Sequence, residues 1–117
     1  MPNQWNSKKK KTQTVWAYHC PDNGVKYKIA IEGYPIELDG EVCYVCHDHI
    51  APTYWMVIEG QTGLRITGVS PPTKKEAEAS ARERIERLIT NHGKHISDVV
   101  EGVSTRTKDL PEYKETT

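Results

Sequence analysis

The sequence of 117 residues has no apolar run close to the roughly 18 residues that cross a bilayer. Its first thirty residues also lack the apolar block of a secretory signal peptide. It has 16 basic and 16 acidic side chains, so the formal charge is zero, and the three cysteines are an odd number. These absences disfavour a membrane protein, a secreted disulfide scaffold and a uniformly basic nucleic-acid binder. We expect a cytoplasmic protein with reduced thiols and no membrane partner.

Core-forming side chains are scarce, because Leu, Ile, Val and Phe together number 22 and Phe is absent. The two ends account for much of the shortage, since Leu110 is the only Leu, Ile or Val in residues 1–11 and 104–117. Terminal segments that bury so few apolar side chains rarely gain enough free energy to offset the conformational entropy they lose on becoming ordered. We therefore expect one domain at 12–103 between a flexible basic arm at 1–11 and a flexible tail at 104–117.

Residues 14–32 have the pattern of a β-hairpin. From Val25 to Glu32, apolar residues fall on odd positions and charged residues mostly on even ones, which predicts a strand with one buried face. The preceding segment 14–20 is β-branched and aromatic, and the Pro-Asp-Asn-Gly sequence at 21–24 is typical of a tight turn.

Further extended segments follow the hairpin. Ile36 and Leu38 alternate with polar residues before a turn at Asp39-Gly40, and the chain extends again over 42–46. Residues 54–59 have the composition of a buried strand, and a turn at 60–63 separates them from an alternating segment at 64–67. Together these patterns predict an antiparallel β-meander of four to five strands.

One helix is well specified by the sequence. Pro71-Pro72 blocks continuation of the sheet, and Thr73 and Glu76 have the spacing of a capping box. Asn91-His92-Gly93 is typical of a left-handed C-cap, so the helix spans about 74–92. The fold class is therefore α+β, with the meander packed on one main C-terminal helix. For residues 95–103, a short helix and an edge strand both fit, and the helix is slightly favoured.

The pattern also predicts which residues form the core. We expect a buried set from the strands and the helix: Trp16, Tyr27, Ile29, Ile31, Trp55, Val57, Leu64, Ile66, Ile85, Leu88 and Ile89. One helix cannot cover both faces of five strands, so we expect the second face to be open. Tyrosine anchors interfaces, and four tyrosines are candidates to line this face and bind a partner: Tyr18, Tyr34, Tyr44 and Tyr54.

Cysteine and histidine cluster in one segment. Cys43, Cys46, His47 and His49 lie within seven residues, and Cys-x-x-Cys with nearby histidine is half of a structural zinc site. The ligand pair that normally completes such a motif is missing, although His19-Cys20 is a candidate. In an extended strand, moreover, Cys43 and Cys46 point to opposite faces. Burial of the two cysteines as small core residues is therefore favoured, and no cofactor is expected, with zinc as the alternative.

A catalytic arrangement can also be written from this cluster. Cys46 or Cys20 would be the nucleophile, a neighbouring histidine the base and Asp48 the orienting group. Nothing in the sequence fixes their geometry, and no Gly-rich phosphate loop is present. We do not expect an enzyme.

The basic arm is the remaining candidate site. Lys8, Lys9, Lys10 and Lys11 could contact phosphates. Residues 12–103 hold nine Lys or Arg against thirteen Asp or Glu, a net charge of −4 that would repel a nucleic-acid backbone. A solubilising tail is therefore the favoured interpretation, and accessory nucleic-acid binding is an alternative.

Three segments carry a resemblance: residues 55–58 (Trp-Met-Val-Ile), 62–66 (Thr-Gly-Leu-Arg-Ile) and 73–77 (Thr-Lys-Lys-Glu-Ala). In this order they resemble the hairpin-then-helix ending of many small uncharacterised bacterial and phage proteins, over residues 54–90. The resemblance implies a fold segment and a bacterial or phage origin, and it implies no activity. Our functional expectation is a non-catalytic binding module that engages a protein partner or a second copy of itself through the open sheet face.

Overall fold

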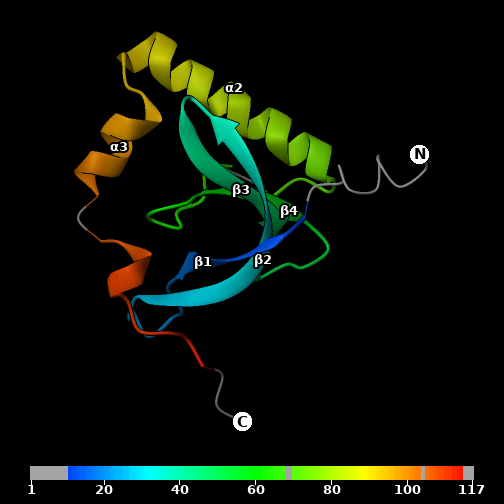
Figure 1. Cartoon of the computed structure of the whole chain (residues 1–117), viewed down its shortest axis with the longest axis vertical. Coiled ribbons are helices and arrows are strands. Elements are labelled where there is room, and N and C mark those ends of the chain that lie inside the picture. Colours follow the sequence, from blue (N-terminus) through cyan, green and yellow to red (C-terminus); the bar gives the residue numbers. More distant parts are fainter. Residues whose placement is uncertain (1–10, 68–69, 104, 115–117) are drawn as a thin grey trace.

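The computed structural model describes residues 11–67, 70–103 and 105–114. Its elements are β1 (Gln13–His19), β2 (Tyr27–Leu38), β3 (Glu41–His47), β4 (Trp55–Glu59), α2 (Lys74–His92), α3 (Ile96–Gly102) and the 3-10 turn η1 (Thr107–Asp109). The strands form one antiparallel sheet in the order β1-β2-β3-β4, and α2 lies across it (Figure 1). The predicted α+β meander with a C-terminal helix is confirmed.

Both short turns form where the sequence predicts them. Gly24 has a φ of 80°, and its N–H donates to the carbonyl of Pro21 at 3.0 Å. Between β2 and β3, Asp39 and Gly40 have φ values of 53° and 78°. Positive φ at both central residues is the requirement of a type I′ turn, which matches the twist of the strands it joins.

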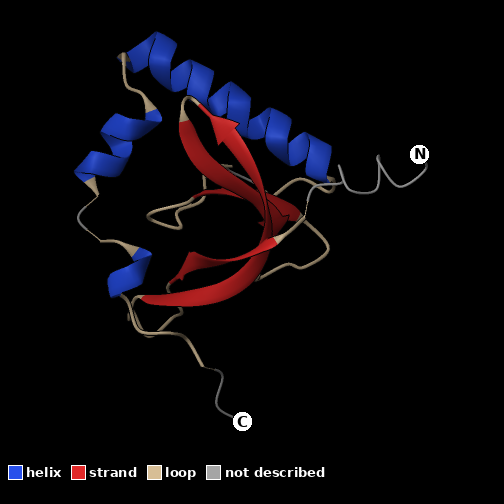
Figure 2. Cartoon of the chain, viewed as in Figure 1, coloured by secondary structure: helices blue, strands red, loops and turns tan. Residues whose placement is uncertain are grey.

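Strand β2 is longer than the sequence pattern indicates. The alternation predicts a strand ending near residue 32 and a second segment at Ile36, but the chain stays extended from Tyr27 to Leu38. Gly33 marks its middle, since it pairs with Gln13 of β1 and also with Cys46 of β3. The first half of β2 therefore belongs to a hairpin with β1 and the second half to a sheet with β3 and β4, as the bent strand shows in Figure 2.

The alternating segment at 64–67 does not become a full fifth strand. It makes an isolated bridge between Arg65 and Ile58, and the N–H of Ile66 donates to Val57 at 2.7 Å. The turn before it also reaches β1, because the N–H of Tyr18 donates to the carbonyl of Gly63 at 3.1 Å. The segment thus follows β4 and brings the end of the meander back toward its beginning.

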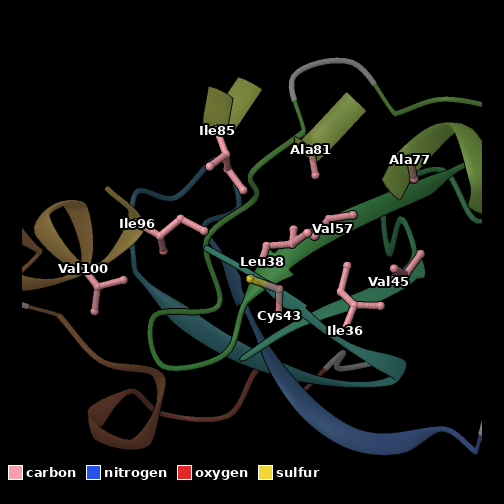
Figure 3. Close-up of a cluster of buried hydrophobic side chains, with 10 residues drawn as sticks. All are labelled: Ile36, Leu38, Cys43, Val45, Val57, Ala77, Ala81, Ile85, Ile96 and Val100. Atoms are coloured by element: carbon pink, nitrogen blue, oxygen red, sulfur yellow. The ribbon is translucent and has the colours of Figure 1, made fainter. Parts of the chain in front are cut away.

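The two faces of the sheet bury separate cores. On the first face, the sheet packs against α2 and α3 through Ile36, Leu38, Cys43, Val45, Val57, Ala77, Ala81, Ile85, Ile96 and Val100 (Figure 3). On the second face, the apolar side of the β1–β2 hairpin covers β3 and β4 through Ala17, Cys46, Met56 and Ile58, with Val15, Ile29, Ile31 and Tyr44 packed around them. The expectation of an open sheet face is therefore wrong, because the bend in β2 folds the hairpin over that face.

The predicted core residues lie in the correct part of the fold, but the prediction omits most of the most deeply buried side chains. Val57 and Ile85 are buried as expected, whereas Trp16, Ile29 and Ile31 are only partly buried. The most deeply buried large side chains belong to the end of β2 and to β3 and β4: Leu38, Met56, Ile58, Val45, Val57, Cys43 and Cys46. β3 and β4 are enclosed on both faces, and such strands lack the alternation that identifies half-buried ones.

The helices follow the sequence closely. The Thr73 side chain accepts a hydrogen bond from the N–H of Glu76 at 3.1 Å, and Gly93 ends α2 with a φ of 62°. Ala77 and Ala81 are fully buried, which lets α2 approach the sheet closely. Residues 96–102 form a helix, so the helical alternative for this region is confirmed.

The C-terminal boundary differs from the expected one. Residues 105–114 do not leave the fold as a tail, because the N–H of Lys28 donates to Pro111 at 2.9 Å and Tyr113 donates back to Lys28 at 2.8 Å. Thr107 is buried and bonds the carbonyl of Gln61 through its N–H at 3.3 Å. Polar and backbone contacts hold this segment, which a count of aliphatic residues does not detect. Residues 1–10 of the expected arm at 1–11, and the last residues, 115–117, lie outside the described residues.

Gly33→Ala should destabilise the fold. A Cβ at this position would lie 2.9 Å from the Cβ of Tyr44 and 3.3 Å from Cγ2 of Val15, in the narrow space between the hairpin and β3. Overpacking of this kind costs about 1–3 kcal/mol, measurable by urea denaturation. Gly102→Ala is the matched control, because its Cβ meets nothing within 4 Å. Equal stability of both variants would contradict a close approach at Gly33.

Candidate functional site

Cys43 and Cys46 lie on opposite faces of β3. Cys43 belongs to the core under α2 and Cys46 to the core under the β1–β2 hairpin, and their exposed fractions are 0% and 1%. Burial is the main reason that the pKa of each thiol is raised to about 12, with the carboxylates of Glu59 near Cys43 and Asp48 near Cys46 adding to it. Both side chains are therefore buried thiols that pack in the two cores.

The four expected metal ligands are not brought together. His47 is exposed and stacks on Trp55 with ring centroids 3.8 Å apart, whereas His49 turns toward the end of β1. Within 11–67, 70–103 and 105–114, no group of three or more His, Cys, Asp or Glu side chains is arranged to hold a metal ion. The structure therefore separates the Cys-x-x-Cys pair from both histidines.

A different pair of histidines does meet. Nδ1 of His19 lies 3.2 Å from Nε2 of His49, and the ring of Tyr113 meets His19 edge to face at 4.6 Å between ring centroids. The two histidines and Cys20 line a cavity of about 440 Å³. A structural zinc site takes four ligands. In the described chain this cavity offers the Cys20 thiol and two imidazoles in contact with each other, and these side chains are not arranged to hold a metal ion. Nδ1 of His49 is buried and has no hydrogen-bond partner.

Asp48, the expected orienting group of a catalytic arrangement, has a structural role. Its Oδ1 accepts the N–H of Ile50 at 2.8 Å, and its Oδ2 accepts the Ser70 hydroxyl at 2.5 Å and lies 3.2 Å from the Arg65 guanidinium. Burial alone would raise the pKa of Asp48, but the bonds from Ser70, Ile50 and Ala51 and the charge of Arg65 outweigh it and lower that pKa. Asp48 therefore fixes the loop after β3.

The four candidate tyrosines do not share a surface. Tyr34 packs against the core under α2, with the Lys74 ammonium 3.9 Å from its ring centroid. Tyr44 packs in the opposite core, Tyr18 lines the cavity of the histidine pair, and Tyr54 is exposed in the loop before β4. They cannot form one binding face. Of the four lysines of the arm, Lys11 is described and exposed, and Lys8, Lys9 and Lys10 lie outside the described residues.

The structure contains a groove that the sequence did not indicate. It has a volume of about 450 Å³ and lies between α2, α3 and the segment after β4. Its apolar lining is Leu64, Ile66, Ile85, Leu88, Ile96, Val99, Val100 and Val103. Val99 is 42% exposed although it belongs to a short helix whose Ile96 and Val100 are buried. The apolar residues at 96, 99, 100 and 103 have the spacing of one helix face, but nothing in the sequence placed residues 64–66 opposite it.

The buried carboxylate of Glu59 fixes one wall of this groove. Glu59 is 4% exposed, and its two oxygens accept the N–H of Gln61, the N–H of Thr62 and the hydroxyl of Thr62, each at 2.8 Å. These bonds hold the turn at 60–63, from which the segment carrying Leu64 continues. The wall opposite the helices is thus preorganised.

Comparisons with known proteins give no relative: no family model, no curated protein and no solved structure matches the chain. The resemblance of residues 54–90 to small bacterial and phage proteins therefore stays a prediction. In the described chain, no helix has a segment long and apolar enough to span a bilayer.

The three thiols should differ sharply in reactivity. Cys20 is exposed, whereas Cys43 and Cys46 are buried and their pKa values are raised to about 12, so little thiolate is available at either. Iodoacetamide followed by intact-mass measurement should add one label to the native protein and three to the denatured protein. Cys20→Ser should abolish native labelling. Labelling of Cys43 or Cys46 as fast as Cys20 would contradict their burial.

His49 should make the fold sensitive to acid. Burial, and next the neighbouring His19, lower the pKa of His49, so the folded state prefers the neutral ring. Below the ordinary histidine pKa of about 6.5 the unfolded chain binds more protons, and stability falls as the pH falls. In His49→Asn the melting temperature should decline less between neutral pH and pH 5 than in the unsubstituted protein.

The exposed His47 provides the matched variant, His47→Asn, which should keep the full acid sensitivity. A separate contribution from His95, whose pKa is raised by its hydrogen bond to Asp39, acts in the opposite direction and is common to all three proteins. The comparison between variants therefore isolates His49. An unchanged pH dependence in His49→Asn would show that its burial has no thermodynamic consequence.

Proposed function

We propose that this protein is a non-catalytic binding module, and that its ligand occupies the groove between α2, α3 and residues 64–66. The observation that carries the proposal is an apolar groove of about 450 Å³ with a fixed wall. Small-molecule sites typically measure about 300–1,000 Å³ and are lined mainly by apolar side chains with a few polar groups. The groove fits this description in both size and lining.

The groove supports binding better than the sheet does. The second face of the sheet is covered by the β1–β2 hairpin, and the four tyrosines lie on different sides of the molecule. In contrast, Val99 presents an apolar side chain to the groove while it remains 42% exposed. Burying such surface under a ligand is favourable at roughly 25 cal/mol per Å². We therefore place the binding site on the helical side of the molecule.

A non-catalytic role agrees with the environments of the candidate catalytic residues. The Cys46 thiol is buried with a pKa raised to about 12, and Asp48 is engaged with Ser70, Arg65 and the backbone of its own loop. His49 contacts His19 in a separate cavity. Cys46 packs in a core and Asp48 holds its loop, and neither these two residues nor His49 and Cys20 line the groove.

A titration with 1-octanol tests the site. We expect chemical-shift changes in ¹H–¹⁵N NMR spectra that are confined to α3, the second half of α2 and residues 60–66, with a Kd on the order of 1 mM for so small a ligand. Val99→Glu should weaken this binding at least about tenfold, because a charge would have to be desolvated in the groove.

Val25→Glu is the matched control, since Val25 is 45% exposed in the turn before β2 and does not line the groove. This variant should bind 1-octanol like the unsubstituted protein. Shift changes elsewhere in the molecule, or equal weakening by both substitutions, would overturn the proposed site.

A further inference from the structure

We propose that the groove selects an amphiphilic anion, namely a medium-chain carboxylic acid whose chain lies on the apolar lining and whose carboxylate meets Arg84. This inference rests on the proposed function, because it names the ligand of the same site. It depends on the distribution of charge around the groove.

The charged side chains that line the groove are mostly basic. Arg65, Arg84 and Arg87 line it together with the imidazole of His92, and Glu59 is the one acid among its lining residues in the described chain. The Glu59 carboxylate is 4% exposed and accepts three hydrogen bonds from the turn at 60–63, so it is already compensated by donors. The groove therefore offers positive charge to a ligand, although residues 12–103 as a whole are acidic.

The three arginines are not equally available. Arg65 lies 3.2 Å from the buried Asp48 carboxylate and donates to Ser70 at 3.1 Å, so its guanidinium group is already engaged by these two side chains. Arg87 pairs with Glu83 one turn earlier in α2. For Arg84, no carboxylate among the described residues lies within 4.0 Å, and the side chain is exposed. Arg84 is therefore the cation that a ligand can engage without breaking an existing pair.

Arg87 can assist Arg84. The two residues are three positions apart and lie on neighbouring parts of the same helix surface. The side chains of Arg87 and Glu83 are 62% and 67% exposed, so their pair is in high dielectric and contributes little to stability. Exchange of Glu83 for a ligand carboxylate therefore costs little. The pair of guanidinium groups would surround the carboxylate at the edge of the groove.

The helix dipole does not cancel this attraction. The C-terminal end of α2 carries partial negative charge, which acts within about the last turn. Arg84 lies eight residues before His92, the last residue of α2, so it is more than two turns from that end. In addition, the N–H of Gly93 bonds the carbonyl of Ile89 at 2.9 Å, which satisfies one terminal carbonyl. The positive rim at Arg84 is thus preserved.

Three ligands that each have a chain of eight carbon atoms but different head groups distinguish the effect of ligand charge from that of apolar contact. Octanoate, 1-octanol and octylammonium should bind in this order of affinity at low salt and neutral pH, with octanoate about three- to tenfold tighter than 1-octanol and octylammonium weaker than both. The advantage of octanoate should shrink at high salt, because an exposed ion pair is screened. NMR titration gives the affinity and the position of each ligand.

Arg84→Gln should lower the ratio of the octanoate affinity to the 1-octanol affinity, because only Arg87 then remains to meet the carboxylate. Arg82→Gln is the matched control: Arg82 lies on the same helix, pairs with Glu78 at 2.9 Å and does not line the groove. Its octanoate affinity should equal that of the unsubstituted protein. An affinity ratio in Arg84→Gln equal to that of the unsubstituted protein would overturn the role of Arg84.

The outcomes separate the inference from the proposed function. Equal affinity for octanoate and 1-octanol, or tighter binding of octylammonium, would overturn anion selection while the groove remained a binding site. Absence of groove binding by all three ligands would overturn the proposed function and, with it, this inference.

Discussion

The buried carboxylate of Glu59 is the interaction on which the arrangement of the remaining elements depends. Three donors at 2.8 Å compensate its charge, and in doing so they fix the turn at 60–63. In that turn, the carbonyl of Gly63 accepts a hydrogen bond from the N–H of Tyr18, and the carbonyl of Gln61 accepts one from the N–H of Thr107. One carboxylate thus connects the end of β4 with β1 and with η1, and it fixes the segment that faces α2 and α3.

Gly63 shows how tightly this junction is packed. Its φ is 67°, and a Cβ there would lie 2.7 Å from the backbone nitrogen of Tyr18 and 2.8 Å from the carbonyl oxygen of Trp16. Gly33 has the equivalent role at the bend of β2, where the hairpin crosses Tyr44. The backbone approaches closely at these two glycines, and small side chains such as Ala17 and Cys46 are therefore buried almost completely. In this way a chain with few aliphatic residues forms two cores.

The sequence predicts those parts of the structure that local chemistry determines. Both tight turns, the cap at Thr73 and the end of α2 at Gly93 follow from single residues with strong conformational preferences. The bend at Gly33 and the contact of Gly63 with β1 do not, because each depends on residues distant in the sequence. The groove could not be predicted for the same reason, because it forms only where residues 64–66 and α3 lie close together in the fold. Clustering of Cys43 and Cys46 with histidines suggested a metal or catalytic site, but the two cysteines are three residues apart on a strand and therefore lie on opposite faces.

The parallel pairing of Lys28 with Glu112 has a consequence for the order of folding events during synthesis. α2 can pack on β3 and β4 once the middle of the chain has been made. The outer edge of β2 at Lys28, in contrast, has to wait for a segment that is translated more than eighty residues later. Until then, the backbone groups of Lys28 that later bond Pro111 and Tyr113 remain open to water or to another extended chain. The β1–β2 hairpin therefore precedes the other described elements in synthesis but is completed only after residues 111–113 have been made.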